Sequence, residues 1–135
     1  MKVRTAAILM VLFGCSTALF SQRPATQDTG PPALVSLIRV IANPKDFHGQ
    51  PIRVVGFLGR GGGLDKGGVG LFVSEIDSRN FIIPNSIDLH VDESMVTSLM
   101  GRYIALSGTY HAPARLGYNG YIDQIVEVSP LRPGK

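Results

Sequence analysis

Two stretches, Gly49-Gln-Pro-Ile-Arg-Val-Val-Gly56 and Gly101-Arg-Tyr-Ile-Ala-Leu-Ser-Gly108, share the pattern G-x-x-I-x-(V/L)-x-G. In each stretch a turn glycine is followed by an alternating segment, which predicts a β-strand with one face in the core. A second glycine inside or just after the strand is typical of a β-bulge or of sharp coiling. Small barrels need such coiling in order to close. The pair therefore predicts two strongly coiled strands of one barrel.

Other periodic segments predict three more strands and two helices. The strands are expected at residues 69–74, 86–91 and 121–128. Apolar residues at i, i+3, i+4 and i+7 predict an amphipathic helix; they are Leu34, Leu37, Ile38 and Ile41. Asn43-Pro44 ends this helix, because proline disfavours helical geometry at the residue before it. One further turn is expected over 45–48, and a short helix over 92–100.

The expected order is a helix, three strands, a short helix and two strands, which is the layout of the OB fold, a five-stranded Greek-key barrel. The chain resembles OB-fold domains of small bacterial proteins in segments 52–58, 71–74, 87–91, 103–110 and 121–128. Residues 41–56 are similar to a group of uncharacterised bacterial OB-like proteins that begin with the same helix and Asn-Pro break. The resemblance covers about 100 of the 135 residues. It implies a mainly β, OB-like barrel and transfers no functional residue; a β-sandwich is the alternative.

The composition favours one small, turn-rich β domain. The chain is 44% hydrophobic, with 16 glycines and 9 prolines, and its length suits a single domain. One cysteine excludes a disulfide-stapled mini-protein. The helical stripe and the strand alternation then give the expected core residues, which are Leu37, Ile41, Ile52, Val54, Leu71, Val73, Leu89, Val91, Ile104, Leu106 and Val126.

The first residues predict export. A cationic start, Met1-Lys2-Val3-Arg4, precedes an apolar run over 5–13, which is the layout of a signal peptide. The run ends in Leu12-Phe13-Gly14-Cys15-Ser16, which resembles the bacterial lipoprotein box. That resemblance implies a signal peptide over 1–14 and lipidation of Cys15, and acyl chains hold a protein on a membrane. We expect a flexible tether over 15–32 and the folded domain over 33–135; ordinary secretion and an uncleaved anchor are the alternatives.

Charge counts against nucleic acid as a partner. The formal net charge is +3, but loss of Lys2 and Arg4 with the signal peptide leaves 11 Lys and Arg against 10 Asp and Glu, a net of +1. Nucleic-acid binders show a clustered basic excess. Asp88, His90 and Asp92 also alternate along one expected strand, and carboxylates on a ligand face repel phosphate.

Several polar and aromatic residues form a possible ligand face, namely Arg60, Lys66, Asp88, His90, Tyr110 and Tyr121. Arg60 and Lys66 belong to the glycine-rich run 59–70, which lacks the spacing of a phosphate-binding loop. The 88–92 row spans about 13 Å, too far for three ligands to one ion unless the strand bends, so a metal would need a further donor such as Glu75 or Asp77. His48 and His111 lie outside any zinc motif. We expect no metal, no cofactor and no catalytic residue. The four tyrosines, which are Tyr103, Tyr110, Tyr118 and Tyr121, are suited either to a stacking platform for a ligand or to one end of the barrel.

These observations predict a lipid-anchored cell-envelope protein that acts as a non-catalytic binding or interaction module, with an unknown protein or small ligand as its partner. The alternative is an OB domain that binds an oligosaccharide or single-stranded nucleic acid. A small hydrolase would require a pocket that joins His90 or His111 to a carboxylate and a nucleophile. The apolar segment 80–85 is a further candidate contact patch, although packing against the first helix explains it as well.

Overall fold

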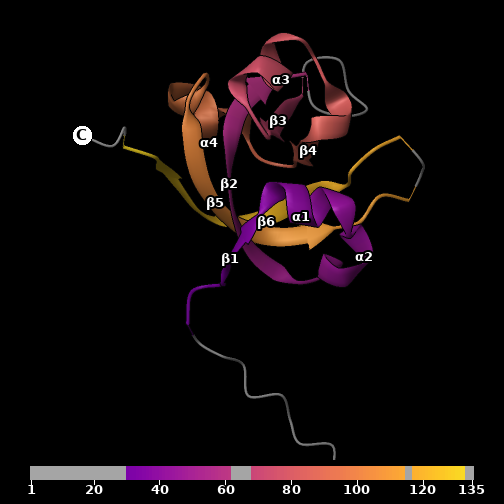
Figure 1. The fold of residues 1–135 in the computed structure, drawn as a ribbon. Helices are drawn as coiled ribbons and strands as arrows, with labels where there is room; N and C mark the ends of the chain where they lie inside the picture. Colours follow the sequence, from indigo (N-terminus) through magenta and orange to yellow (C-terminus); the bar gives the residue numbers. More distant parts are fainter. Residues whose placement is uncertain (1–29, 62–67, 115–116, 133–135) are drawn as a thin grey trace, which may run out of the picture.

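The computed structural model describes residues 30–61, 68–114 and 117–132, in which short helices surround a six-stranded mixed sheet (Figure 1). The expected signal peptide over 1–14 and most of the tether lie outside these residues. The elements are β1 (Leu34–Ser36), α1 (Leu37–Ala42), α2 (Pro44–Phe47), β2 (Pro51–Arg60), β3 (Val69–Phe72), α3 (Glu75–Arg79), the 3-10 helix η1 (Ile83–Asn85), β4 (Ser86–Leu89), α4 (Glu93–Val96), the 3-10 helix η2 (Thr97–Leu99), β5 (Tyr103–His111) and β6 (Tyr121–Pro130). None of the helices in this part of the chain is long and apolar enough to cross a bilayer.

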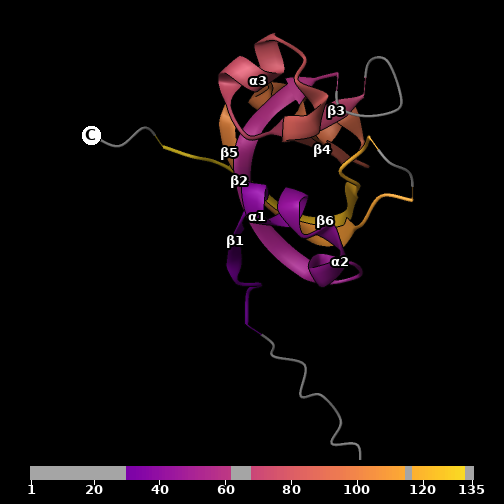
Figure 2. The ribbon, with the colours of Figure 1, turned by 45° about the vertical axis from the view of Figure 1, so that its right-hand side comes forward.

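Strand β2 pairs with three other strands. Its residues 57–60 pair antiparallel with β3, and its residues 51–57 pair antiparallel with β5. On the same edge that pairs with β3, residues 53–55 of β2 pair in parallel with β1. The pairing path continues from β3 to β4, from β4 in parallel to β6, and from β6 to β5, so it returns to β2. Figure 2 shows β2 as one long, strongly curved strand.

Two of the strand glycines allow backbones to approach closely. A Cβ at Gly56 would lie 2.6 Å from Cγ of Leu71, and a Cβ at Gly108 would lie 2.7 Å from the carbonyl oxygen of Asp123. The β5–β6 register shifts between Ser107 and Thr109, so the expected irregularity at Gly108 is confirmed. Both turn glycines, Gly49 and Gly101, have positive φ, at +72° and +74°, a conformation that glycine adopts without steric cost.

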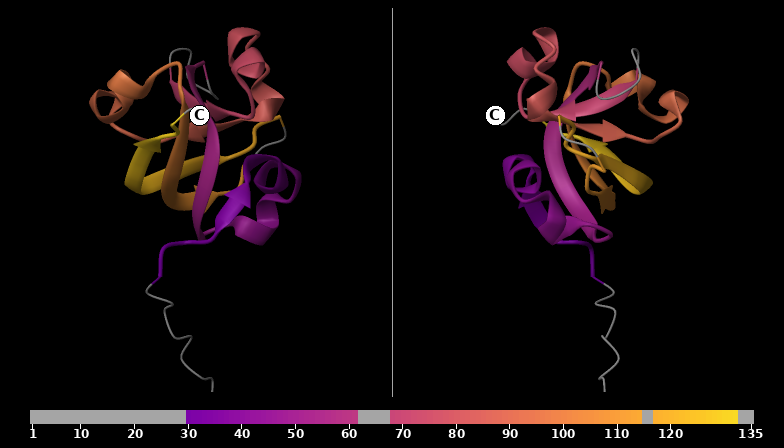
Figure 3. Two further views of the ribbon diagram at one scale, coloured as in Figure 1. Left: turned by 60° about the vertical axis from the view of Figure 1, so that its left-hand side comes forward. Right: turned by 90° about the vertical axis from the view of Figure 1, so that its right-hand side faces the viewer.

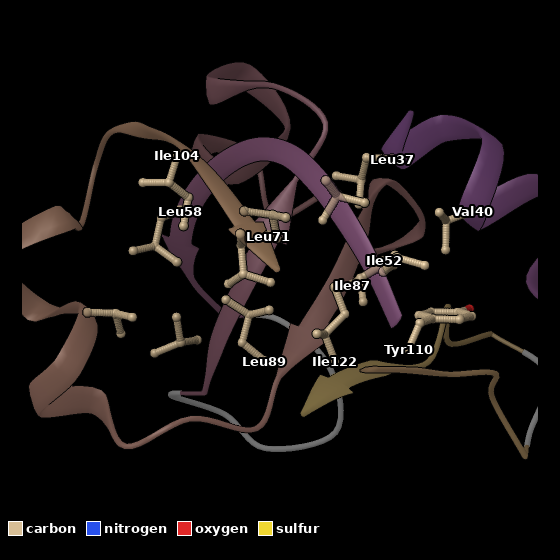
Figure 4. Packing of buried hydrophobic residues seen from close by; sticks show 14 of the residues in the cluster. Leu37, Val40, Ile52, Leu58, Leu71, Ile87, Leu89, Ile104, Tyr110 and Ile122 are labelled. Atoms are coloured by element: carbon tan, nitrogen blue, oxygen red, sulfur yellow. The ribbon is translucent and has the colours of Figure 1, made fainter. Parts of the chain in front are cut away.

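The core lies inside the curve of β2, and Figure 4 shows Leu37 and Val40 of α1 facing it. Most of the expected core residues are confirmed as buried, whereas Ile41, Val73 and Val91 are half-buried. The expectation for Val126 is wrong, because this side chain is 80% exposed. Residues 124–126 lie between the paired residues Asp123 and Glu127, opposite only Gly108, and Gln124 has a φ of +47°. Such a bulge removes a residue from the inward alternation of its strand.

The first helix is shorter than the apolar spacing predicts. Residues 34–36 form β1 instead, because their backbone pairs with β2, and tertiary pairing outweighs a local periodic preference. Leu34 and Ile38 are therefore exposed, while Leu37 and Val40 carry the buried side of α1. The expected helix over 92–100 is divided into α4 and η2.

Helix α3 is an element that the periodicity did not predict. Ser74 is its N-cap, since its hydroxyl accepts a hydrogen bond from the Asp77 backbone N–H at 3.2 Å. Figure 3 shows α1 and α3 on one side of the molecule and α4 on the other. The following apolar segment leaves Phe81 64% exposed, as the contact-patch interpretation of residues 80–85 allows.

We predict that Leu106→Ala lowers the free energy of unfolding by about 2–5 kcal/mol, because it opens a cavity at a fully buried position. Urea or guanidinium melts measure this loss. Val126→Ala is the matched control on the neighbouring strand and should change stability by less than about 0.5 kcal/mol. Equal effects of the two substitutions would contradict the assignment of strand faces.

Candidate functional site

All three histidines of the chain border one hollow of about 510 Å³. His48 directly follows α2, His90 directly follows β4, and His111 is the last residue of β5. Tyr121, the first residue of β6, lies among them. We call this hollow the histidine pocket; its lining residues are His48, Asp88, His90, His111, Ala112, Pro113, Ala114, Tyr118, Gly120 and Tyr121.

Three of these rings form a stack on the outer face of the sheet. The ring centroids of His90 and Tyr121 are 4.0 Å apart with an interplanar angle of 15°, and those of Tyr121 and His111 are 4.7 Å apart at 16°. Because β6 lies between β4 and β5, Tyr121 stands between the two imidazoles. His48 approaches His111 edge-on, at 5.9 Å and 81°.

Hydrogen bonds orient two of the imidazoles. Nε2 of His111 lies 2.9 Å from Oδ1 of Asp123, its neighbour on the same sheet face. Nδ1 of His48 accepts the backbone N–H of Ala112 at 3.1 Å, which places the proton of the neutral ring on Nε2. Asp88 precedes His90 by two residues and therefore shares its face of the strand. The pocket thus combines oriented ring nitrogens with carboxylate oxygens.

Asn119 fixes the backbone just before β6. Its Nδ2 donates to the carbonyl oxygens of Pro84 at 2.6 Å and of Ser86 at 2.9 Å. The backbone carbonyl oxygen of Asn119 accepts a hydrogen bond from the hydroxyl of Tyr110 at 2.6 Å. The next residue, Gly120, has a φ of +84°, and a Cβ there would lie 2.1 Å from the carbonyl oxygen of His111. These constraints fix the backbone from which Tyr121 enters the stack.

The structure brings together three of the six residues of the expected ligand face, namely Asp88, His90 and Tyr121. The expectation for Tyr110 is wrong: its side chain is fully buried in the core, where it faces the same interior as Ile122. Figure 4 shows it beside Ile52 and Val40. Arg60 is ion-paired with Glu93 of α4 and does not line the histidine pocket. Lys66 lies outside the described residues.

The expected polar row of Asp88, His90 and Asp92 does not continue to its last member, because β4 ends at Leu89. Asp92 is the N-cap of α4 and accepts the backbone N–H of Ser94 at 2.9 Å, and this bond lowers the pKa of its carboxyl. Asp77, the possible further metal donor, is buried at α3; hydrogen bonds from the Ser74 hydroxyl and from Asn85 lower its pKa. Among the residues that the structure describes, no group of three or more His, Cys, Asp or Glu is arranged to hold a metal ion.

Sequence reasoning did not select His48, His111 and Asp123 for this site. His111 and Asp123 meet because β5 and β6 pair in a register that places His111 opposite Tyr121 and Thr109 opposite Asp123. His48, which directly follows α2, contacts the His111 ring from 63 residues earlier in the chain. The sequence could have indicated the His111–Asp123 contact only through the pairing register of β5 and β6. The loop between these strands is too long to specify that register.

The His111–Asp123 pair supplies two of the three groups that the hydrolase hypothesis requires, namely the histidine and the carboxylate. The side chains of His111 and Asp123 are 26% and 30% exposed, and of the two only His111 lines the pocket. Within the described residues, the lining of the pocket contains no Ser, Thr or Cys to serve as the nucleophile. This lining offers instead a set of hydrogen-bonding groups at fixed positions.

Comparison of the chain with models of protein families, with curated proteins and with solved structures gave no match. The function is therefore inferred from the sequence and from the geometry of the pocket.

We predict that Tyr110 makes the fold sensitive to high pH. Burial raises the pKa of its phenol from 10.0 to about 12, because the interior disfavours the phenolate. The unfolded chain loses this proton near the ordinary pKa while the folded chain keeps it, so stability is fully present below pH 10.0 and falls as the pH rises toward about 12. Urea melts across this range should show a steeper fall for the wild type than for Tyr110→Phe; equal slopes would contradict the assignment.

Proposed function

We propose that the protein is a lipid-anchored binding module of the cell envelope, and that the histidine pocket is its ligand site. The stacked rings of His90, Tyr121 and His111 carry this proposal, because they place polar groups from three strands around one half-open hollow. Hollows of a few hundred Å³ with a small number of oriented polar groups are the usual form of a ligand site. The role is one of binding, with no reaction assigned to it.

We further propose that the domain is an OB-like barrel. Support comes from the pairing path β2–β3–β4–β6–β5–β2 and from the position of α4 between β4 and β5. The antiparallel β2–β5 pairing joins the two strands with the shared glycine pattern. In this arrangement the histidine pocket lies on the outside of the barrel wall, where β4, β6 and β5 are neighbours.

The anchor is proposed from the sequence around Cys15. Acyl chains on this cysteine contribute about 0.8 kcal/mol per buried methylene, so two or three chains hold the protein on a membrane. The segment from residue 15 to residue 32 then separates the barrel from the lipid surface. Secretion without an anchor is the alternative, and it removes Cys15 with the signal peptide.

Mass spectrometry of the membrane-extracted protein tests the anchor. We expect a chain that begins at Cys15 and carries the added mass of acyl groups. Cys15→Ala should move the protein from the membrane fraction to the soluble fraction, whereas the neighbouring substitution Ser16→Ala should leave it on the membrane. An unmodified chain that begins after Ala18 would contradict lipidation.

A second candidate function is suggested by the same pocket, namely that the OB-like domain binds an oligosaccharide or single-stranded nucleic acid. The mature net charge of +1 favours the first of these, since binding of nucleic acid relies on a clustered basic excess.

Chromatography on heparin or phosphocellulose at low salt checks the exclusion of nucleic acid. With a mature net charge of +1, the extracted protein should elute early, because polyanion binding grows with the number of cations that contact it. Strong retention that weakens steeply with added salt would favour nucleic acid instead.

A further inference from the structure

Two arginine side chains at one end of the sheet have no partner. Among the arginines that the structure describes, three are ion-paired with glutamates, and the guanidinium of Arg39 lies 5.7 Å from the centroid of an aromatic ring. The guanidiniums of Arg102 and Arg132 make no ion pair or ring contact within the described chain. Both arginines line one hollow of about 510 Å³. We call it the arginine hollow; its lining residues are Arg102, Tyr103, Leu131 and Arg132.

The pairing of β5 with β6 places these two arginines opposite each other. The antiparallel ladder continues past the end of β6, because the Leu131 N–H donates to the Tyr103 carbonyl oxygen at 2.9 Å. In this register the next opposed pair is Arg102 and Arg132. Like charges at directly opposite positions destabilise an antiparallel pair. A bound anion would remove that repulsion and give both guanidiniums a partner.

The other two lining residues give the hollow a partly apolar surface. Tyr103 and Leu131 are 41% and 44% exposed. The Tyr103 ring packs edge-on against Phe57, with centroids 5.3 Å apart at 75°, and its hydroxyl accepts the Glu75 N–H at 3.2 Å. These contacts hold the ring in one position beside the two cations. A ligand that matches this surface carries an apolar group next to its anionic group.

The number of guanidiniums selects the kind of anion. A single guanidinium fork already occupies both oxygens of a carboxylate. A phosphate monoester has three terminal oxygens and a charge of about −1.5 to −2 at pH 7, as phosphoserine does. It can therefore accept hydrogen bonds from two guanidiniums at once and balance the charge of both.

We propose that the arginine hollow binds a phosphate monoester that carries an apolar group. The phosphate oxygens accept hydrogen bonds from Arg102 and Arg132, and the apolar group lies against Tyr103 and Leu131. This is a second site beside the histidine pocket, since the two have no described lining residue in common. Two sources offer this chemistry, namely a soluble organic phosphate and the headgroup of a lipid such as phosphatidate.

The test uses the mature protein as isolated from cells, in buffer with an uncharged detergent. Calorimetry and the arginine Nε–H signals in NMR follow its titration with phenyl phosphate, inorganic phosphate and benzoate. Phenyl phosphate should bind and shift the signals of Arg102 and Arg132. It should bind at least tenfold more tightly than benzoate, which fills only one fork, and several-fold more tightly than inorganic phosphate, which lacks the apolar group.

Variants locate the binding. Arg102→Gln and Arg132→Gln should each weaken phenyl phosphate at least tenfold, because each removes charged hydrogen bonds. The corresponding Lys variants should weaken it several-fold, since lysine keeps the charge but lacks the planar fork. Arg39→Gln is the matched control on α1; it changes the net charge equally and should leave binding unchanged. Without ligand, Arg102→Gln should melt no lower than the wild type, because it removes one of two opposed like charges.

A further pair of titrations distinguishes the two sources of the ligand. Dihexanoyl phosphatidate carries a phosphate monoester on a short-chain lipid, and dihexanoyl phosphatidylcholine is its uncharged counterpart. Tighter binding of the phosphatidate than of phenyl phosphate would support the site and indicate a lipid headgroup, whereas the reverse order would support it and indicate a soluble organic phosphate. The phosphatidylcholine should bind at least tenfold more weakly than the phosphatidate.

Four results would overturn the proposal. Equal affinity for benzoate and phenyl phosphate would show that phosphate is not selected. Equal weakening by Arg39→Gln and Arg102→Gln would show a response to net charge alone. Equal binding of the two lipids would show contact with the lipid surface and no phosphate site. If no probe shifts the signals of Arg102 and Arg132, the arginine hollow is not a site, and the proposal for the histidine pocket is unaffected.

Discussion

The hydrogen bonding of β2 to partners on both of its edges is the constraint on which the rest of the structure depends. Phe57 pairs with Phe72 of β3 and with Tyr103 of β5, so one strand joins the two ends of the pairing path. A flat strand cannot serve both partners over its length, and coiling of this degree requires close backbone approach. Gly56 permits that approach, because any side chain there would meet Leu71 and the Phe72 carbonyl oxygen.

The histidine pocket arises from the same pairing path. Since β6 lies between β4 and β5, the first residue of β6 enters between His90 and His111. Tyr110 precedes His111 on β5 and points into the core, and its hydroxyl donates a hydrogen bond to the backbone carbonyl of Asn119. Core and pocket are therefore linked, because Tyr110 fills the interior and Asn119 directly precedes the pocket residues Gly120 and Tyr121.

The ligand chemistry proposed for the histidine pocket agrees with the charge balance of the whole chain. A mature net charge of +1 supplies no long-range attraction for a polyanion. An oligosaccharide, the ligand of the second candidate function, needs no such attraction, because its recognition relies on short-range hydrogen bonds from groups that the sheet already holds in position.

The sequence by itself determined the elements that local chemistry encodes. Alternation predicted β2 to β6, proline ended α1, and the paired glycines indicated where strands coil. Asp88 and His90 were also identified as facing outward, because alternation assigns each residue to one side of its strand. Only the tertiary structure decided which strands are neighbours. His111 and Asp123 meet through the register of β5 and β6, and His48 packs against His111 from a distant part of the chain. The same long-range pairing converts residues 34–36 to a strand and exposes Val126 at a bulge, since alternation says nothing about what lies opposite.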